Sequence, residues 1–376
     1  MHGHNGLWST GRRGCAGTIG CFGRPRLSPV TVERRLSGDA EELFRLYQEV
    51  FGEGLTSSSR TRWRWQYLEN PLTPEEGIQI WVAREGEAVL GQYASMPVRL
   101  FWGGHEVRSS WGMDVFLRPE ARGKGIGALL FTTWSDHVEV ALGLGLTPSS
   151  YGLFKKLRYE DVGPVPFFQK ILDASAVARR RLGPWLGTMA GAALRAGLAL
   201  RSPERARAAD GVEVAPITGF GPEYDTLWER SRGGYAMCVR RDAAYLNWKY
   251  VSCPTRRYAL HEARRSGTLA GFAVSRHEDY HGLRLGWIVD VFADPRDSAA
   301  KDALLGAVLR GFREAGVARA QAFSMNAALA ADLRRRGFAV ARSPMLFCVR
   351  ANVPSAEVFA DPGGWHVVFG DSDMDR

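Results

Sequence analysis

Three glycines at alternate positions, Gly123, Gly125 and Gly127, have the type and spacing needed to bind a ligand. Glycine lets the backbone approach a ligand closely, and an apolar helical pattern begins directly after the third glycine. The free N–H groups at a helix start, together with the positive end of the helix dipole, bind anions. Arg122 and Lys124 add positive charge to the loop. The pattern therefore predicts a ligand that carries phosphates.

This loop must be held between a strand and a helix. The run Val115 to Leu117 is apolar and β-like, and Pro119 ends it because proline cannot continue a central ladder. Two nucleotide-binding patterns do not fit. A dinucleotide fingerprint follows the first strand of a βαβ unit and needs an acidic residue about 20 positions later, which is not evident here. A Walker loop needs Ser or Thr after its lysine, and Lys124 is followed by Gly125.

The order Arg122-x-x-Gly125-x-Gly127, after Leu117-Arg118-Pro119, resembles the acyl-CoA site of the GNAT superfamily of acyltransferases. The resemblance implies that the amides of residues 123 to 128 hold the CoA pyrophosphate. It also implies that the edge of the preceding strand pairs with the pantetheine arm, and it implies no metal. The residues implied to bind acetyl-CoA or another acyl-CoA are Val115, Phe116, Leu117, Arg122, Gly123, Lys124, Gly125, Ile126, Gly127, Ala128, Ser150 and Phe154.

The pattern of the surrounding chain is similar to the GNAT order of elements. A first amphipathic helix is followed by an antiparallel meander, the glycine loop, a helix, a strand, a helix and a final strand. The fold class expected is therefore α+β or α/β, with a mixed, mostly antiparallel central sheet flanked by helices. The expected segments are 39–51, 78–83, 88–94, 98–102, a strand from 107, 126–141, 143–146, 149–157 and 165–171.

A second GNAT-like motif covers Ser150 to Tyr159 and departs from the family pattern at two positions. Phe154 stands where many members have the tyrosine that protonates the leaving thiolate, and Arg158 replaces the usual glycine. The phenylalanine removes a hydroxyl that can act as an acid. We therefore expect Phe154 to contribute only packing near the CoA tail.

The second half of the chain repeats the first. Trp65-x-Tyr67-x-x-x-Pro71 returns as Trp248-x-Tyr250-x-x-x-Pro254, an offset of 183, and Asp114 returns as Asp290, an offset of 176. The second copy has no glycine between Asp294 and Asp302, so we do not expect it to bind CoA. The predicted organisation is a disordered N-terminal extension (1–29), an acyl-CoA-binding GNAT repeat (30–172), a helical connector (173–211), a degenerate GNAT repeat (212–352) and a C-terminal strand with an acidic tail (353–376).

Composition limits the classes of partner. The 376 residues carry a net charge of +9 that is spread along the chain, which argues against nucleic acid as a partner. The five cysteines show neither CxxC nor metal-ligand spacing, so reduced thiols and a cytoplasmic location are expected. The apolar connector is too short to span a bilayer comfortably and contains Arg195. We expect no stable membrane insertion, with an interfacial helix as the alternative. The oligomeric state stays open.

The doubled Trp-x-Tyr-x-x-x-Pro and the closing residues Trp365 to Asp373 narrow the resemblance. They are similar to a group of bacterial tandem-GNAT proteins, some linked to surface polysaccharide synthesis. The function expected is N-acyl transfer, from acetyl-CoA to a primary amine of a small acceptor such as an amino sugar. Such chemistry needs a base. The candidates are Asp114 on the core strand and Asp371 in the tail. The alternatives are aminoacyl transfer from aminoacyl-tRNA and a non-catalytic CoA-binding module.

Overall fold

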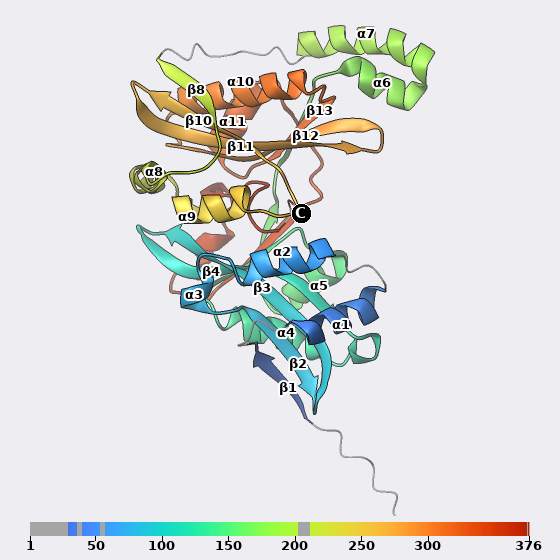
Figure 1. Ribbon diagram of the computed structural model, residues 1–376, viewed down its shortest axis with the longest axis vertical. Helices are drawn as coiled ribbons and strands as arrows, with labels where there is room; N and C mark the ends of the chain where they lie inside the picture. Colours follow the sequence, from blue (N-terminus) through green and yellow to red (C-terminus); the bar gives the residue numbers. More distant parts are fainter. Residues whose placement is uncertain (1–28, 36–39, 53–56, 202–210, 374, 376) are drawn as a thin grey trace, which may run out of the picture.

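The computed structural model describes residues 29–35, 40–52, 57–201, 211–373 and 375 (Figure 1). The predicted N-terminal extension, up to residue 28, lies outside this part of the chain. Two sheets, each covered by helices, lie one above the other. Both sheets are mixed and mostly antiparallel, which confirms the predicted fold class.

The first sheet is built around two long strands, β3 (Ala88–Trp102) and β4 (His105–Leu117). The order of its main path is β1 (Val30–Arg34), β2 (Ile80–Glu85), β3, β4, β5 (Val140–Leu144), β15 (Leu346–Ala351) and β6 (Glu160–Pro164). The short strand β9 (Met237–Val239) pairs with β3 and with β16 (Trp365–His366). The helices of this half are α1 (Glu41–Phe51), α2 (Ser57–Tyr67), α3 (Thr73–Glu76), α4 (Ile126–Ser135) and α5 (Pro148–Lys156).

The second sheet repeats this plan with β11 (Thr268–Tyr280) and β12 (Leu283–Ala293) at its centre. Its order is β14 (Ala339–Ala341), β7 (Phe167–Ile171), β13 (Arg319–Phe323), β12, β11, β10 (Ala259–Arg265) and β8 (Val212–Ile217). Its helices are α8 (Glu223–Ser231), α9 (Ala243–Leu246), which continues as a π-helical turn over Asn247–Val251, α10 (Ser298–Glu314) and α11 (Ala327–Arg335).

The two halves exchange strands. The strand β7 comes from the first sequence repeat but lies in the second sheet, between β13 and β14. The strand β15 comes from the second repeat but lies in the first sheet, between β5 and β6. The largest hydrophobic cluster contains residues of both sheets, among them Ile80 and Phe272. The halves therefore share a core.

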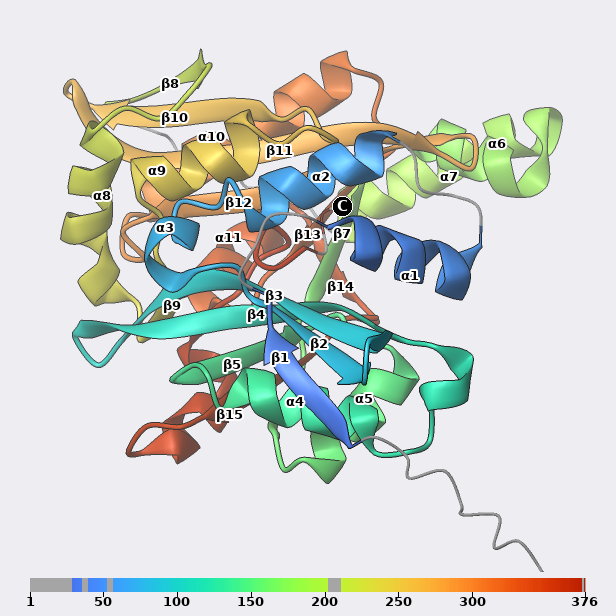
Figure 2. The same ribbon diagram turned by 60° about the horizontal axis from the view of Figure 1, so that its bottom comes forward.

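The repeated Trp-x-Tyr motif lies on α2 and directly after α9, two helices that lie next to each other (Figure 2), and it forms one of the contacts between the halves. The rings of Trp65 on α2 and Trp248 after α9 stack with centroids 4.9 Å apart. Each indole N–H donates to the backbone carbonyl of the other tryptophan, at 2.8 and 2.9 Å. This reciprocal pairing places the two copies of the motif around an approximate two-fold axis.

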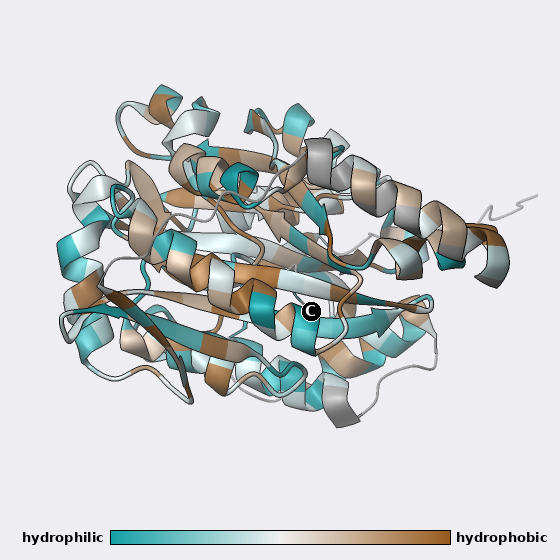
Figure 3. Cartoon of the chain, turned by 90° about the horizontal axis from the view of Figure 1, so that it is seen from above, coloured by the Kyte–Doolittle hydropathy of each residue, from teal (hydrophilic) through white to brown (hydrophobic). Residues whose placement is uncertain are grey.

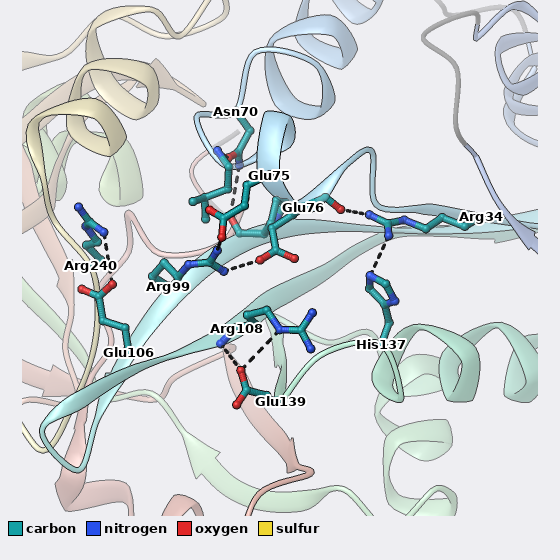
Figure 4. A network of polar contacts seen from close by, with 12 residues as sticks. Arg34, Asn70, Glu75, Glu76, Arg99, Glu106, Arg108, His137, Glu139 and Arg240 are labelled. Carbon is teal, nitrogen blue, oxygen red and sulfur yellow. Dashed lines mark hydrogen bonds and ion pairs between the residues drawn. The ribbon is translucent and has the colours of Figure 1, made fainter.

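A polar network fixes the outer part of the β3–β4 hairpin (Figure 4). Arg99 on β3 pairs at 2.5 Å with both Glu75 and Glu76 of α3. Glu106 on β4 pairs at 3.3 Å with Arg240 of the second half. The network therefore joins α3, the hairpin and the second half.

One long strand, β3, replaces the two strands predicted over 88–94 and 98–102. Pro97 is tolerated inside it because β2 pairs with β3 only as far as Ala94. On that side the strand is locally an edge, where proline interrupts no ladder.

The predicted connector begins with a helical hairpin, α6 (Ala174–Leu182) and α7 (Pro184–Arg201), which projects from one side of the molecule (Figure 1). Seen from above, the outer helices carry both apolar and hydrophilic residues (Figure 3). Across the described part of the chain, no helix combines the length and apolar character needed to cross a bilayer.

Candidate functional site

The glycine loop lies between the end of β4 and the start of α4. Gly123 and Gly125 have φ angles of +75° and +81°, a left-handed conformation that favours glycine. An added Cβ atom at either residue would have no neighbour within 4 Å, so this backbone borders open space. The first N–H groups of α4 have no partner within the helix. Arg122 and Lys124 are exposed beside them, so the structure brings the predicted anion-binding residues to one helix start.

The strands β4 and β5 separate close to this loop. They pair in parallel only over Ser109–Trp111 and Val140–Leu142. Beyond these residues β4 continues to Leu117, whereas β5 continues beside β15. The edge of β4 that faces the gap includes Val115, which is 37% exposed. An extended ligand arm can pair with the backbone groups of such an edge.

Asp114 occupies a break in the pairing of β3 and β4. The register shifts between Gln92 and Ala94, which marks a β-bulge at Asp114 and Val115 of β4, opposite Tyr93. Asp114 itself has a φ angle of 45°, rare for a residue other than glycine. Bulges and strained residues of this kind cluster at functional sites because they redirect a side chain.

The side chain of Asp114 is held by helix α2. Its Oδ2 atom accepts a hydrogen bond from the Tyr67 hydroxyl at 2.6 Å and one from Gln66 Nε2 at 3.4 Å. Burial, and secondarily the nearby charge of Asp114, raise the pKa of Tyr67 well above its usual value. The tyrosine therefore stays protonated and donates to the carboxylate.

A cavity of about 180 Å³ opens between α1, α2 and β4, with Asp114 in its wall. Most of its apolar lining residues are aromatic, and Thr255 of the second half also lines it. Arg62 is the cationic side chain of the wall. The lining residues are Leu43, Phe44, Tyr47, Ser59, Arg62, Trp63, Gln66, Tyr67, Gln92, Asp114, Phe116 and Thr255. Because Phe116 lies in the same strand segment as Val115, the cavity and the gap beside β4 are neighbours.

The corresponding place in the second half is filled by the chain itself. Tyr250 donates to Asp290 Oδ2 at 2.9 Å, as Tyr67 does to Asp114. There, however, Arg241 forms an ion pair with Asp290 at 3.2 Å and another with Asp371 at 3.1 Å. The side chains of these three residues are at most 1% exposed.

The start of α10 in the second half is capped by a carboxylate. Asp297 is its N-cap residue and accepts a hydrogen bond from the amide of Ala300 at 2.9 Å. A carboxylate thus occupies the position where a phosphate would bind, which supports the expectation that this half binds no CoA.

The predicted base Asp371 lies inside this buried network. One carboxylate oxygen also accepts a hydrogen bond from the amide of Val368 at 2.9 Å. This placement favours a structural role for Asp371 and leaves Asp114 as the candidate base.

Two residues implied to bind the cofactor lie on or beside α5. Ser150 takes part in the N-terminal cap of α5, where its amide donates to Thr147 Oγ1 at 3.2 Å. Phe154 is 1% exposed and packs against Phe131 and Tyr159, with ring centroids 5.1 and 4.5 Å away. Phe154 therefore belongs to the aromatic core beneath α4 and α5.

We predict that Phe154→Leu costs stability and little activity. Shrinking a buried ring leaves space in the core, which lowers the free energy of unfolding by about 1–3 kcal/mol. Urea denaturation measures this loss, and steady-state kinetics should show a kcat within tenfold of wild type. A fall in kcat beyond about a hundredfold, the scale of acid–base catalysis, would instead give the ring a role in the reaction.

Sequence reasoning missed Arg62 and Gln66 as site residues. The sequence contains a pattern that could have identified them. The cavity residues of α2 follow helical spacing and therefore share one face of the helix. These residues are Ser59, Arg62, Trp63, Gln66 and Tyr67.

In the part of the chain that the structure describes, no group of three or more His, Cys, Asp or Glu residues is arranged to hold a metal ion. The candidate site consists of a helix start, an unpaired strand edge and an acid beside a small cavity.

Comparison with protein families gives a direct match for this half. The family model of the GNAT acetyltransferase domain matches residues 33–161, which include α1 to α5, the glycine loop and Asp114. No significant match is found among proteins of curated function.

Solved structures resemble nearly the whole chain. A GCN5-related N-acetyltransferase from Anabaena variabilis has a TM-score of 0.61 at 14% identity, over 89% of this chain and 75% of that chain. Eis1 from Mycobacterium abscessus has a TM-score of 0.53 at 16% identity, over 89% and 76%. The N-myristoyltransferase of Saccharomyces cerevisiae with bound myristoyl-CoA has a TM-score of 0.52 at 12% identity, over 87% and 83%. At these identities the likeness shows the fold.

Proposed function

We propose that this chain, whose residues 33–161 match the GNAT acetyltransferase domain, is an acyl-CoA N-acyltransferase that transfers the acetyl group of acetyl-CoA to a primary amine of a small acceptor. The observation that carries the proposal is the position of Asp114. Its carboxylate lies at the bulge of β4, between the unpaired edge of that strand and the cavity beside α2.

Acetyl-CoA is placed by the loop and the strand edge. The amides of residues 123–128 and the charges of Arg122 and Lys124 hold the pyrophosphate. The pantetheine arm pairs with the edge of β4 from Val115 to Leu117, which brings the thioester beside Asp114.

The reaction needs one proton transfer before the new bond forms. Asp114 takes a proton from the acceptor ammonium, and the free amine attacks the thioester carbonyl carbon. Backbone N–H groups at the unpaired edge of β4 stabilise the oxyanion that results. The carbon–sulfur bond then breaks as the nitrogen releases its second proton to solvent. The neutral amide remains, and the CoA thiolate leaves and takes a proton from solvent. Tyr67 acts as a positioning residue because it donates to Asp114.

An amino sugar suits the cavity as acceptor. The volume of about 180 Å³ admits a single small ring, and the aromatic walls offer faces on which a sugar ring can stack. The resemblance to proteins linked to surface polysaccharide synthesis favours the same class of acceptor.

We predict that Asp114→Asn lowers kcat by about 10²–10⁴-fold, because the isosteric amide cannot accept the proton. The Kd for acetyl-CoA should not change, since the glycine loop is untouched. Thiol release measured with a panel of primary amines reports kcat, and calorimetry reports the Kd.

A normal kcat in Asp114→Asn would remove this carboxylate from the mechanism. Binding of acetyl-CoA without turnover of any amine would favour the non-catalytic CoA-binding module. Acyl transfer that requires charged tRNA and is indifferent to acetyl-CoA would favour the aminoacyltransferase alternative.

A further inference from the structure

We propose that the acceptor carries an anionic group, a carboxylate or a phosphate, close to its reacting amine, and that Arg62 binds this group. The inference rests on the proposed function and names the chemical class of its acceptor. A zwitterion such as an amino acid or an amino sugar phosphate has the required pair of charges.

The cavity wall carries a positive charge at Arg62 and a negative charge at Asp114, and the side-chain amide of Gln66 contacts both. Gln66 accepts a hydrogen bond from Arg62 Nη2 at 2.9 Å through its Oε1 atom. Through Nε2 the same side chain reaches Asp114 Oδ2 at 3.4 Å. Gln66 is 1% exposed and therefore fixed. Arg62 and Asp114 thus face the same small cavity at a set separation, as a ligand with a cation and an anion requires.

Arg62 keeps hydrogen-bonding capacity for a ligand. A guanidinium has five N–H donors, and Arg62 forms an ion pair with Asp373 at 3.7 Å, a separation beyond hydrogen-bonding distance. The arginines with structural roles in this fold are held more tightly. Arg336 bonds Asp302 at 2.6 and 2.8 Å, and Arg99 bonds two glutamates at 2.5 Å. The Arg62 side chain is also 22% exposed, so a ligand can reach it.

The second half contains the same pair of an aspartate and a tyrosine, and it shows which charged groups can pack against that pair. Next to Asp290 and Tyr250 the chain places the guanidinium of Arg241, and next to that cation it places the carboxylate of Asp371. The filled site therefore holds a cation against the strand acid and an anion against the cation. At the offset of 183 residues the first half has serine at position 58 in place of arginine. We infer that the substrate itself brings the corresponding charges to the first half.

The charge pattern also predicts which amines are rejected. A polyamine would place a second positive charge beside Arg62, which is repulsive. A neutral amine would bind Asp114 but leave Arg62 with only its present partners. Anionic amines should therefore be the best acceptors and polyamines the poorest.

Matched acceptors test the proposal. Glucosamine 6-phosphate should exceed glucosamine, and an amino acid should exceed its methyl ester, by at least tenfold in kcat/KM. Arg62→Gln should abolish both preferences by raising KM for the anionic member of each pair, with little change for the neutral member. Arg64→Gln is the control, because Arg64 is 70% exposed, pairs with Glu69 and lies outside the cavity wall.

Calorimetric titration of the same acceptors into the protein with bound CoA decides the question independently of turnover. Loss of anionic-acceptor binding in Arg62→Gln supports the proposal. Equal binding of charged and neutral members, or an equal loss of both in the variant, overturns it. If neutral amines turn over as well as anionic ones, the acyltransferase function stands and this inference fails. If no amine turns over, the proposed function fails, and the titration still decides whether Arg62 binds anions.

Discussion

Gly127→Glu is expected to lower the affinity for acetyl-CoA by at least a hundredfold, as measured by calorimetry. The substitution adds a carboxylate to the first turn of α4, where the phosphates are expected to bind. Two like charges 4 Å apart at a partly exposed site repel by about 4 kcal/mol, which is sufficient for such a loss. Gly127 suits this test better than Gly125, because Gly125 has a positive φ angle that a side chain would strain.

The fold should survive this substitution. A Cβ atom at Gly127 would lie 3.6 Å from Leu117 and 3.7 Å from Leu153, which is ordinary van der Waals contact. A glutamate in the first turn of a helix is also favoured by the helix dipole. An unchanged melting temperature would confirm that only binding was lost.

Ala299→Glu is the matched control, because Ala299 is the second residue of α10 as Gly127 is of α4. Binding by this variant should equal that of wild type, with one acetyl-CoA per chain. Two equivalent sites in the wild-type titration, or an equal loss in both variants, would contradict a single site in the first half.

The glycine loop was predictable from sequence because its information is local. A strand ending, two glycines with positive φ and a helix start all lie within about a dozen consecutive residues, and each has its own composition. The Trp65 and Trp248 repeat was predictable for a similar reason, since tryptophans at a fixed offset are rare. The structure adds that these two rings stack on one another.

The environment of Asp114 was not predictable in the same way. Its conformation depends on a register shift between β3 and β4, and its partners come from a helix 47 and 48 residues away. The exchange of β7 and β15 is likewise a property of strand pairing over more than a hundred residues. The residue pattern of a single strand does not indicate which strand it pairs with. The sheet to which β7 or β15 belongs could therefore not be predicted from the sequence.

The C-terminal tail shows most clearly which features could not be predicted from the sequence. Alternation from Trp365 to Phe369 suggested a strand that orders the tail, and the structure does bury Trp365, Val367 and Phe369. The charge on Asp371 suggested chemistry, however, because nothing in the sequence indicated that Arg241 would meet it. A buried acid and a catalytic acid look alike until the partner is known.

Arg241→Met is expected to lower the free energy of unfolding by about 3–5 kcal/mol, as measured by urea denaturation at pH 7. The guanidinium is completely buried between the carboxylates of Asp290 and Asp371. Removing it leaves two acids in the interior without their common cation. By contrast, Arg264→Met should cost no more than about 1 kcal/mol, because Arg264 is 32% exposed and its partners are near solvent.

The loss in Arg241→Met should shrink as the pH falls. Burial, above all, already raises the pKa of Asp290, and without Arg241 that pKa rises further. An acid whose pKa is higher in the folded than in the unfolded protein makes the folded state bind more protons, so stability rises as the pH falls through the folded pKa. Adding Asp290→Asn and Asp371→Asn to Arg241→Met should therefore restore most of the stability at pH 7 and remove this pH dependence.

If Arg241→Met alone unfolds no more easily than wild type, the buried network does not hold the tail. Because Asp373 of the same tail approaches Arg62, a loosened tail should also change the KM for the acceptor while leaving the Kd for acetyl-CoA unchanged.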